Sequence, residues 1–185
     1  MGFLPEGTTV PTSADNYTKL ETGDNKFRLF GKPLMGWECW IKVKEGPRPI
    51  RREREDQLPS KGDRPSSFWA FVVYNYKLKK FQVLSIKQKT IMRQLVALEE
   101  DEDWGDLREY DINIKKTGEA RETKYQVLPL PKKKVAKDIK DEYDGLKINM
   151  DLYMSSEDKP YGGHPFIESQ EQDEEEVVDP DDLPF

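Results

Sequence analysis

The sequence is poor in the residues that most metal sites and many enzymes require. Its 185 residues contain one cysteine, Cys39, and one histidine, His164. A single cysteine cannot form an internal disulfide, which fits a reducing compartment, and the two residues together cannot build a structural zinc site. The chain also lacks the phosphate-binding motifs GxxxxGK[ST] and GxGxxG and the nucleophile motif GxSxG. These absences argue against zinc modules, nucleotide-dependent enzymes and serine hydrolases.

Long hydrophobic runs are absent as well. The longest apolar stretch, residues 68–76, is far shorter than the ~20 residues that cross a bilayer. The first residues, MGFLPEGTTVP, lack the basic start and apolar core of a secretory signal. Gly2 lacks the Ser or Thr that myristoylation requires. We therefore expect no membrane association.

Hydrophobic residues make up 35% of the chain and charged residues 36%, so the core should be small. The net charge of −6 is unevenly distributed. Nine of the 36 carboxylates lie in residues 165–185, which contain no Lys or Arg, so residues 1–164 carry a net charge of +3. The sequence thus predicts a mildly basic body with a strongly acidic tail.

Alternating and β-branched segments predict five strands, the first of them bent. Gly-Lys-Pro at residues 31–33 interrupts the first strand, and prolines with dense charge make residues 44–66 a long loop. Helical spacing of apolar residues over 91–98, after Thr90 as N-cap, predicts one helix. The predicted strands are residues 26–30 with 34–43, 68–76, 81–88, 110–116 and 124–130, and a short helix is expected at 135–143.

Five strands with one helix between the third and fourth match the OB fold, a five-stranded Greek-key barrel. The predicted fold is therefore mainly β. The strand 2–3 face and adjacent loops of an OB barrel commonly bind oligonucleotides, although the fold alone does not establish function. The predicted organisation is an N-terminal arm at 1–24, the OB domain at 25–145, a linker at 146–164 and a disordered acidic tail at 165–185.

The predicted hairpin over residues 68–88 decides where a binding face lies. Leu84 and Ile86 have the more apolar neighbours, so we assign their face to the core. Exposed rings beside cations on the other face suit a single-strand binder, because bases stack on rings at about 1–3 kcal/mol each and cations neutralise phosphates. If the register is one residue off, the same rings are ordinary core. The rings and cations of that face are Tyr74, Tyr76, Phe81, Lys77 and Lys87.

Trp40 lies on the polar face of the first strand, whereas Trp37 lies on its apolar face. Exposing a Trp is costly without a purpose, so Trp40 is the better stacking candidate; the alternative is that it covers the end of the barrel. Basic and amide side chains on the first and fourth strands and in the 44–66 loop are candidate phosphate contacts, although acidic residues in that loop offset part of its positive charge. They are Lys42 on the first strand, Arg48, Arg51, Arg52 and Arg54 in the loop, and Asn113, Lys115 and Lys116 on the fourth strand.

The acidic tail ends in an apolar tip, Leu183-Pro184-Phe185, behind Asp181 and Asp182. A terminal Phe can fill an apolar pocket while the carboxylates contact basic groups around it, which is a common form of short linear ligand. The simpler alternative is that the tail only adds solubility.

The residues from Asp179 to Phe185 resemble the tip of bacterial single-stranded DNA-binding proteins, an Asp-rich run that ends in Ile/Leu-Pro-Phe. A series of stretches also resembles tailed-bacteriophage single-stranded DNA-binding proteins with an OB fold. These are NKFRLF, GWECW, PRPIR, FWAFVVYNY, the run from Phe81 to Thr90, DWG, YDINIKK and YQVLP. The resemblance covers residues 16–131 and the tail.

The resemblance implies a non-enzymatic, cofactor-free protein that coats single-stranded DNA in phage replication, recombination and repair, in the cytoplasm of a bacterial host. It implies that the tail recruits replication proteins such as polymerase or helicase-primase and competes with DNA for the groove; weak self-association stays open. Another such phage family has a Cys/His zinc site, which this chain lacks. The alternative function is an OB interaction module whose main ligand is another replication protein. A nuclease or ligase is disfavoured, because residues 99–103 fit a helix end better than a Mg²⁺ site.

Overall fold

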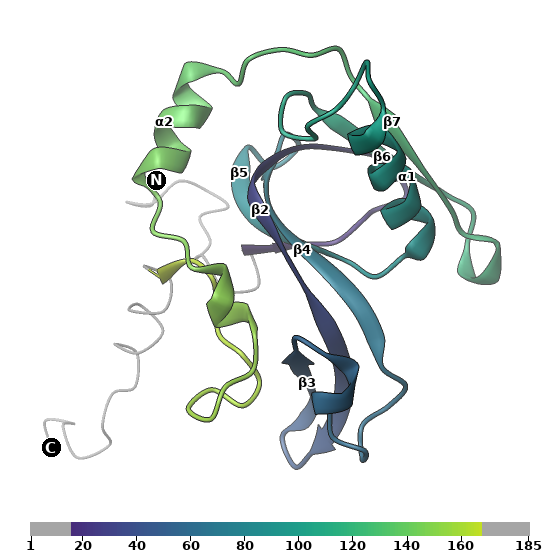
Figure 1. Ribbon diagram of the computed structural model, residues 1–185, viewed down its shortest axis with the longest axis vertical. Coiled ribbons are helices and arrows are strands. Elements are labelled where there is room, and N and C mark those ends of the chain that lie inside the picture. Colours follow the sequence, from purple (N-terminus) through teal and green to yellow (C-terminus); the bar gives the residue numbers. More distant parts are fainter. Residues whose placement is uncertain (1–15, 168–185) are drawn as a thin grey trace, which may run out of the picture.

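The computed structural model describes residues 16–167, which form a curved sheet of seven strands with two α-helices (Figure 1). No helix within this range has the length and hydropathy needed to span a membrane. The strands are β1 (Tyr17–Thr18), β2 (Gly23–Val43), β3 (Gly46–Arg52), β4 (Ser66–Asn75), β5 (Lys80–Ile86), β6 (Ile112–Thr117) and β7 (Lys124–Pro129). The helices are α1 (Lys89–Glu100) and α2 (Lys137–Gly145), with 3₁₀ turns at Glu55–Gln57, Ala120–Glu122 and Met150–Tyr153.

The strand order is β1-β5-β4-β2-β6-β7, and β3 pairs with β2. β1 runs parallel to β5, and the other pairs are antiparallel. Apart from the β2–β3 hairpin, β2, β4 and β5 follow one another and β6 returns to lie beside β2, which is a Greek-key connection. The mainly β architecture and the helix between the β4–β5 hairpin and β6 are confirmed. Within residues 16–167, no pairing joins β5 to β7, so the sheet is open.

β2 is a single bent strand, as the sequence predicted. Gly31 has a φ of +66°, a conformation that glycine adopts without steric cost, and the register with β4 shifts between Phe30 and Leu34. The first part of β2 pairs with β6 and its last part with β3. The bend therefore lets a single strand pair with β6 near its start and with β3 near its end.

The predicted loop over residues 44–66 is wrong in its first part, where residues 46–52 form β3. Prolines suggested a loop because they cannot donate to a sheet. Pro47 and Pro49 are two residues apart on an edge strand, so both missing N–H groups fall on the side that faces away from β2. The basic residues of this segment therefore stand on a hairpin instead of a loop.

Two boundaries nearer the N-terminus also differ from the prediction. Residues 17–18, assigned to a loose arm, pair with Val83 and Leu84 of β5. Helix α1 begins at Lys89 with Gln88 as its N-cap, so Thr90 lies inside the helix.

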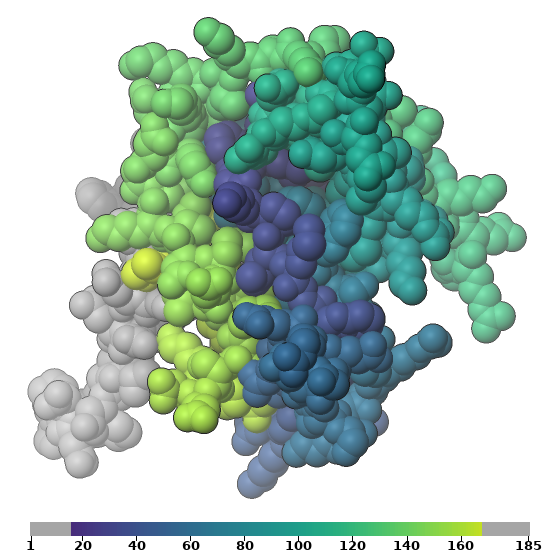
Figure 2. Space-filling view, in the orientation of Figure 1, coloured from purple at the N-terminus to yellow at the C-terminus, as the bar shows by residue number. Residues whose placement is uncertain are grey.

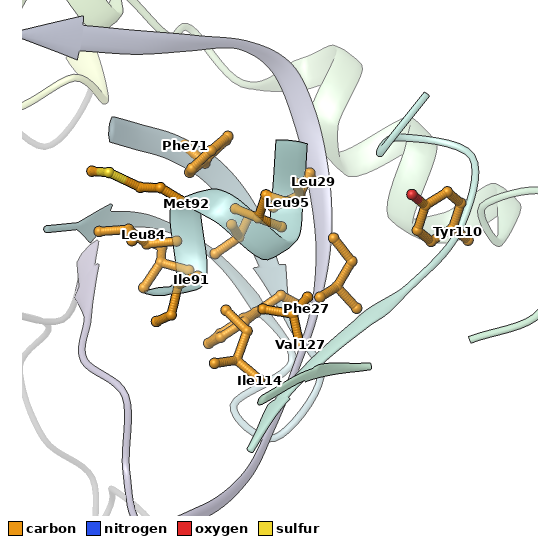
Figure 3. Close-up of a cluster of buried hydrophobic side chains, with 13 residues drawn as sticks. Phe27, Leu29, Phe71, Leu84, Ile91, Met92, Leu95, Tyr110, Ile114 and Val127 are labelled. Atoms are coloured by element: carbon orange, nitrogen blue, oxygen red, sulfur yellow. The ribbon is translucent and has the colours of Figure 1, made fainter. Parts of the chain in front are cut away.

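The main core lies between the inner face of the curved sheet and α1. Leu84 and Ile86 are each 1% exposed and pack there with Phe71 and Val73, so the predicted core face of the hairpin is confirmed. Figure 3 shows the side chains of α1 among those of the strands. The other buried members are Phe27, Leu29, Ile91, Met92, Leu95, Tyr110, Ile112, Ile114 and Val127.

A second core lies on the outer face of the sheet, beneath residues 135–167, which we call the C-terminal cover. The chain passes along the left of Figure 1 through α2, and Figure 2 shows it in green to yellow-green beside β2 and β3. Residues 146–164 were expected to be a linker, but Tyr153 within them is 4% exposed and packs against the sheet. The helix expected at 135–143 is present as α2. The tail tip, including Asp179, lies outside the described residues.

Candidate functional site

A surface hollow of about 760 Å³ lies beside β1, β2, β5 and the C-terminal cover. We call it the Trp40 hollow. Its lining combines Trp40 with the amides of Asn25, Asn75 and Gln82 and with charged groups in which cations outnumber carboxylates. The cations are Lys19, Lys26, Arg51, Lys77 and Lys87, and the carboxylates are Glu21, Asp24 and Glu38.

Trp40 is 39% exposed, as its place on the polar face of the strand suggested. Cys39 and Ile41, its neighbours in β2, face the other way and pack against β3. The indole Nε1 of Trp40 donates a hydrogen bond to Oε1 of Glu38 at 2.9 Å, and Nζ of Lys87 lies 5.8 Å from the ring centroid. The ring is therefore fixed at its N–H and has a cation beside it, an arrangement that suits stacking of a nucleic-acid base.

Glu38 holds the side chains of Trp40, Arg51 and Lys87 together at the edge of the hollow. Its side chain is 2% exposed and accepts hydrogen bonds from Nε of Arg51 at 2.7 Å and from Nζ of Lys87. A buried carboxylate is tolerated when it is paired in this way. Our sequence analysis did not single out Glu38; the available signal was its position two residues from Trp40 on the same face of a strand.

Arg51 and Arg52 are committed to the C-terminal cover. The guanidinium of Arg51 lies 3.8 Å from the ring centroid of Tyr153, and its backbone N–H donates to Oγ of Ser155 at 3.0 Å. Nη1 of Arg52 donates to the carbonyl oxygen of Ser155. Both arginines were predicted to bind phosphates, but in this structure their contacts hold the cover against β3.

The other basic residues of the β2–β3 hairpin fall on two faces. Lys42 shares a face with Trp40 and is exposed, whereas Arg48 pairs with Ile41 and so lies on the opposite face. Arg54 forms an exposed ion pair with Asp56 at 3.0 Å. Of this group, Lys42 is the residue that extends the surface around Trp40.

The aromatic residues of the β4–β5 hairpin are not accessible, so the predicted exposure is wrong for Tyr74 and Phe81, which are 8% and 5% exposed. The two residues lie on the outer face, as expected, but they pair with each other, whereas the sequence placed Tyr74 opposite Val83 and Tyr76 opposite Phe81; the cover lies on them. The rings of Phe81 and Tyr143 of α2 are 5.5 Å apart. Tyr76 is half-buried, and Nζ of Lys26 lies 4.5 Å from its ring centroid. The sequence could not show that a segment more than 50 residues away covers this face.

The predicted contacts on β6 lie next to the start of β2. Nδ2 of Asn113 donates to Asp24 at 2.9 Å, and Asp24 lines the hollow. Lys77 forms an exposed ion pair at the rim. Lys115 is exposed and Lys116 is half-buried on the same strand. This edge therefore carries cations close to the hollow without forming its wall.

A buried ionic cluster lies where β2, β4 and β6 meet. The carboxylate of Asp111 is 0% exposed and accepts hydrogen bonds from Oη of Tyr76 at 2.7 Å and Nη1 of Arg28 at 3.2 Å; Nζ of Lys133 lies 3.1 Å away. Burial alone raises the pKa of Asp111, but the hydrogen bonds from Tyr76, Lys133 and Arg28 outweigh it, so the net pKa is lowered. The group is an ionised structural anchor.

The N-terminal wall of the hollow was missed, because residues 17–26 were assigned largely to the arm. Tyr17, Lys19 and Asn25 all contribute to it. Burial and the nearby Tyr153 raise the pKa of Tyr17 to about 12, so its hydroxyl stays neutral at physiological pH.

Comparisons with protein-family models, curated proteins and solved structures find no match to this chain.

Proposed function

We propose that this protein binds single-stranded DNA in the Trp40 hollow and coats it without sequence preference. The observation that carries the proposal is the exposed ring of Trp40, which Glu38 holds at its N–H beside the cation of Lys87. A ring stacks on any base, and lysines attract the phosphates that follow, so this combination favours a single strand over a duplex, whose bases are already stacked.

The chain connectivity supports an OB-type barrel as the scaffold. The order β5-β4-β2-β6-β7 follows the five strands predicted from the sequence, with α1 between the third and the fourth. In such barrels the strand 2–3 face and the neighbouring loops carry oligonucleotide sites. The Trp40 hollow includes residues of β4 and β5, which correspond to these strands.

The resemblance to phage single-stranded DNA-binding proteins gives the biological setting of this proposal: replication, recombination and repair of phage DNA. On this proposal the protein is not an enzyme, and the acidic tail recruits replication proteins and competes with DNA for the hollow. The weak positive charge of residues 1–164, +3, favours a mode of binding in which stacking contributes as much as charge.

Trp40→Ala should weaken binding to an unstructured oligonucleotide by about 5- to 150-fold, the equivalent of one lost stacking contact of about 1–3 kcal/mol. Fluorescence anisotropy of a labelled oligonucleotide measures the affinity at fixed salt, because the variant lacks the ring whose fluorescence DNA would quench. Tyr161→Ala is the control, because it removes an exposed aromatic side chain that does not line the hollow. Equal affinities of the Trp40 variant and the unaltered chain would contradict the proposal and favour a protein ligand as the main partner.

Truncation after Ile167 should tighten DNA binding, because it removes all nine carboxylates of residues 168–185 and leaves the packed residues of the cover in place. We expect a gain of roughly tenfold at low salt that shrinks as salt is raised. A chain whose tail carboxylates are replaced by Asn and Gln separates charge from length and should behave like the truncated chain. Unchanged or weaker affinity after truncation would exclude competition by the tail.

A further inference from the structure

A second cavity lies between α1 and the bend of β2, on a part of the surface that shares no residue with the Trp40 hollow. It has a volume of about 310 Å³ and an apolar lining that includes Leu29, Met35, Trp69, Leu95 and Val96. We call it the α1–β2 cavity. Its size is at the lower end of ligand sites and suits one or two apolar side chains.

The bend of β2 creates this cavity. Where the register with β4 shifts between Phe30 and Leu34, the strand swings away from the sheet, and α1 closes the space from the other side. Met35 and Val96 at the cavity are 52% and 41% exposed, although both are large apolar side chains. A compact group of exposed apolar side chains in a hollow marks a place where another apolar group binds.

The charges around the cavity favour an acidic occupant. Lys32 and Arg108 line it, and an adjoining hollow that shares Trp69 and Val96 adds Lys89 and Arg93. Two carboxylates also line the cavity, and both have internal partners. Asp106 pairs with Arg108 at 2.6 Å, and Oε2 of Glu99 accepts the backbone N–H of Leu107 at 2.9 Å. Because Arg108 and Asp106 neutralise each other, three cations, Lys32, Lys89 and Arg93, remain against the one carboxylate of Glu99.

We propose that the α1–β2 cavity binds the C-terminal tip of this same chain, with the ring of Phe185 in the apolar space. Leu183 and Pro184 add apolar surface, and Asp181 and Asp182 face the surrounding cations. The tip therefore combines an apolar end with negative charge directly before it, which matches the apolar lining of the cavity and the cations around it.

The chain beyond Ile167 is long enough to reach any part of a domain of this size. Its 18 residues have a relaxed end-to-end distance of roughly 23 Å and a maximum of about 60 Å, against a diameter of about 40 Å for a compact domain of about 150 residues. A tether of this kind gives an effective concentration in the millimolar range, so even a weak intrinsic affinity fills the cavity. The tip is then sequestered in the free protein, and a partner that binds the tip must compete with the cavity. The carboxylates of residues 168–176, between Ile167 and the tip, are then the part of the tail that competes with DNA for the hollow. This inference does not depend on DNA binding.

Methionine methyl resonances of the full-length chain test the proposal, because the methionines report on different sites. Met35 lines the cavity and Met92 the adjoining hollow, whereas Met150 and Met154 pack in the second core. Phe185→Ala should remove the ring from the cavity and shift the Met35 resonance by more than its linewidth. The Met150 and Met154 resonances should not move. Val177→Ala, which truncates an apolar side chain earlier in the tail, is the control and should shift none of them.

A second variant tests the cavity from the other side. Val96→Asp places a negative charge at an exposed position of α1, where folding tolerates it. It should release the tip, so that adding Phe185→Ala no longer moves Met35. An unmoved Met35 in Phe185→Ala alone, or a response at Met150 and Met154 instead, would overturn the proposal. A Met35 position that changes on dilution would also overturn it, because the occupant would then be the tip of a second copy.

Discussion

Replacing Asp111 with Asn should lower the free energy of unfolding by about 3–5 kcal/mol, the usual cost of removing one partner of a buried ion pair. Asn keeps the shape of the side chain and can still accept hydrogen bonds from Tyr76 and Arg28. It removes the charge, however, and Arg28 is only 2% exposed. The loss arises because the Arg28 guanidinium stays buried beside a neutral group.

Urea denaturation followed by circular dichroism measures this loss. Glu109→Gln is the matched control, because Glu109 lies two residues away and forms an exposed ion pair with Lys132 at 3.1 Å. Exposed pairs contribute little, so the control should change the free energy by less than about 1 kcal/mol. A loss at Asp111 no larger than that of the control would show that the ionic cluster does not anchor the fold.

The same variant should change the response to acid. The pKa of Asp111 is lowered in the folded protein, so the ionised group stabilises the fold above its unfolded-state pKa of about 3.9. That contribution disappears as the pH falls below about 4 and through the lowered folded-state pKa. We therefore expect the unaltered protein to lose more stability than Asp111→Asn between neutral pH and pH 3. Parallel losses would contradict the assignment.

The sequence predicted the elements that depend on local patterns. The alternation of apolar and polar residues over 81–88 was sufficient to place Leu84 and Ile86 in the core, because a strand places alternate side chains on opposite faces. Helical spacing identified α1 to within two residues at its N-terminal end. The polar face of β2 correctly indicated that Trp40 is exposed.

What the sequence could not predict depends on contacts between distant segments. Residues 146–167 show no strand or helix periodicity, because they cover the sheet in an irregular path with one 3₁₀ turn. Each apolar residue there is placed by its contact with the sheet, as Tyr153 is with Phe68 at 5.7 Å between ring centroids. The pattern of residues adjacent in the sequence does not reveal contacts between segments that are far apart along the chain. The aromatic face of the hairpin was therefore assigned to solvent, although its alternation was correct.

Tyr153→Ala should lower the free energy of unfolding by about 3–5 kcal/mol, because it removes a large buried ring and leaves a cavity. The ring packs on Phe68, lies under the guanidinium of Arg51 and sits 6.1 Å from Tyr17, so it connects the cover to three strands. Tyr161→Ala is the control: Tyr161 belongs to the same segment but is 37% exposed, and its loss should change stability by no more than about 0.5 kcal/mol. Urea denaturation compares the two variants.

The DNA affinity of Tyr143→Ala then separates two roles for the outer aromatic face, because Tyr143 covers Phe81 and, unlike Tyr153, does not line the Trp40 hollow. If Trp40 and Lys87 carry the binding, loosening the cover should leave the affinity within about threefold, since Glu38 still positions both residues. A gain of tenfold or more would mean that Tyr74 and Phe81 stack bases once they are uncovered, as first expected from their pattern. In that case adding Phe81→Ala should abolish the gain, whereas Trp40→Ala should not. The cover would then control access to a second stacking surface, and the Trp40 hollow would be one part of a longer site.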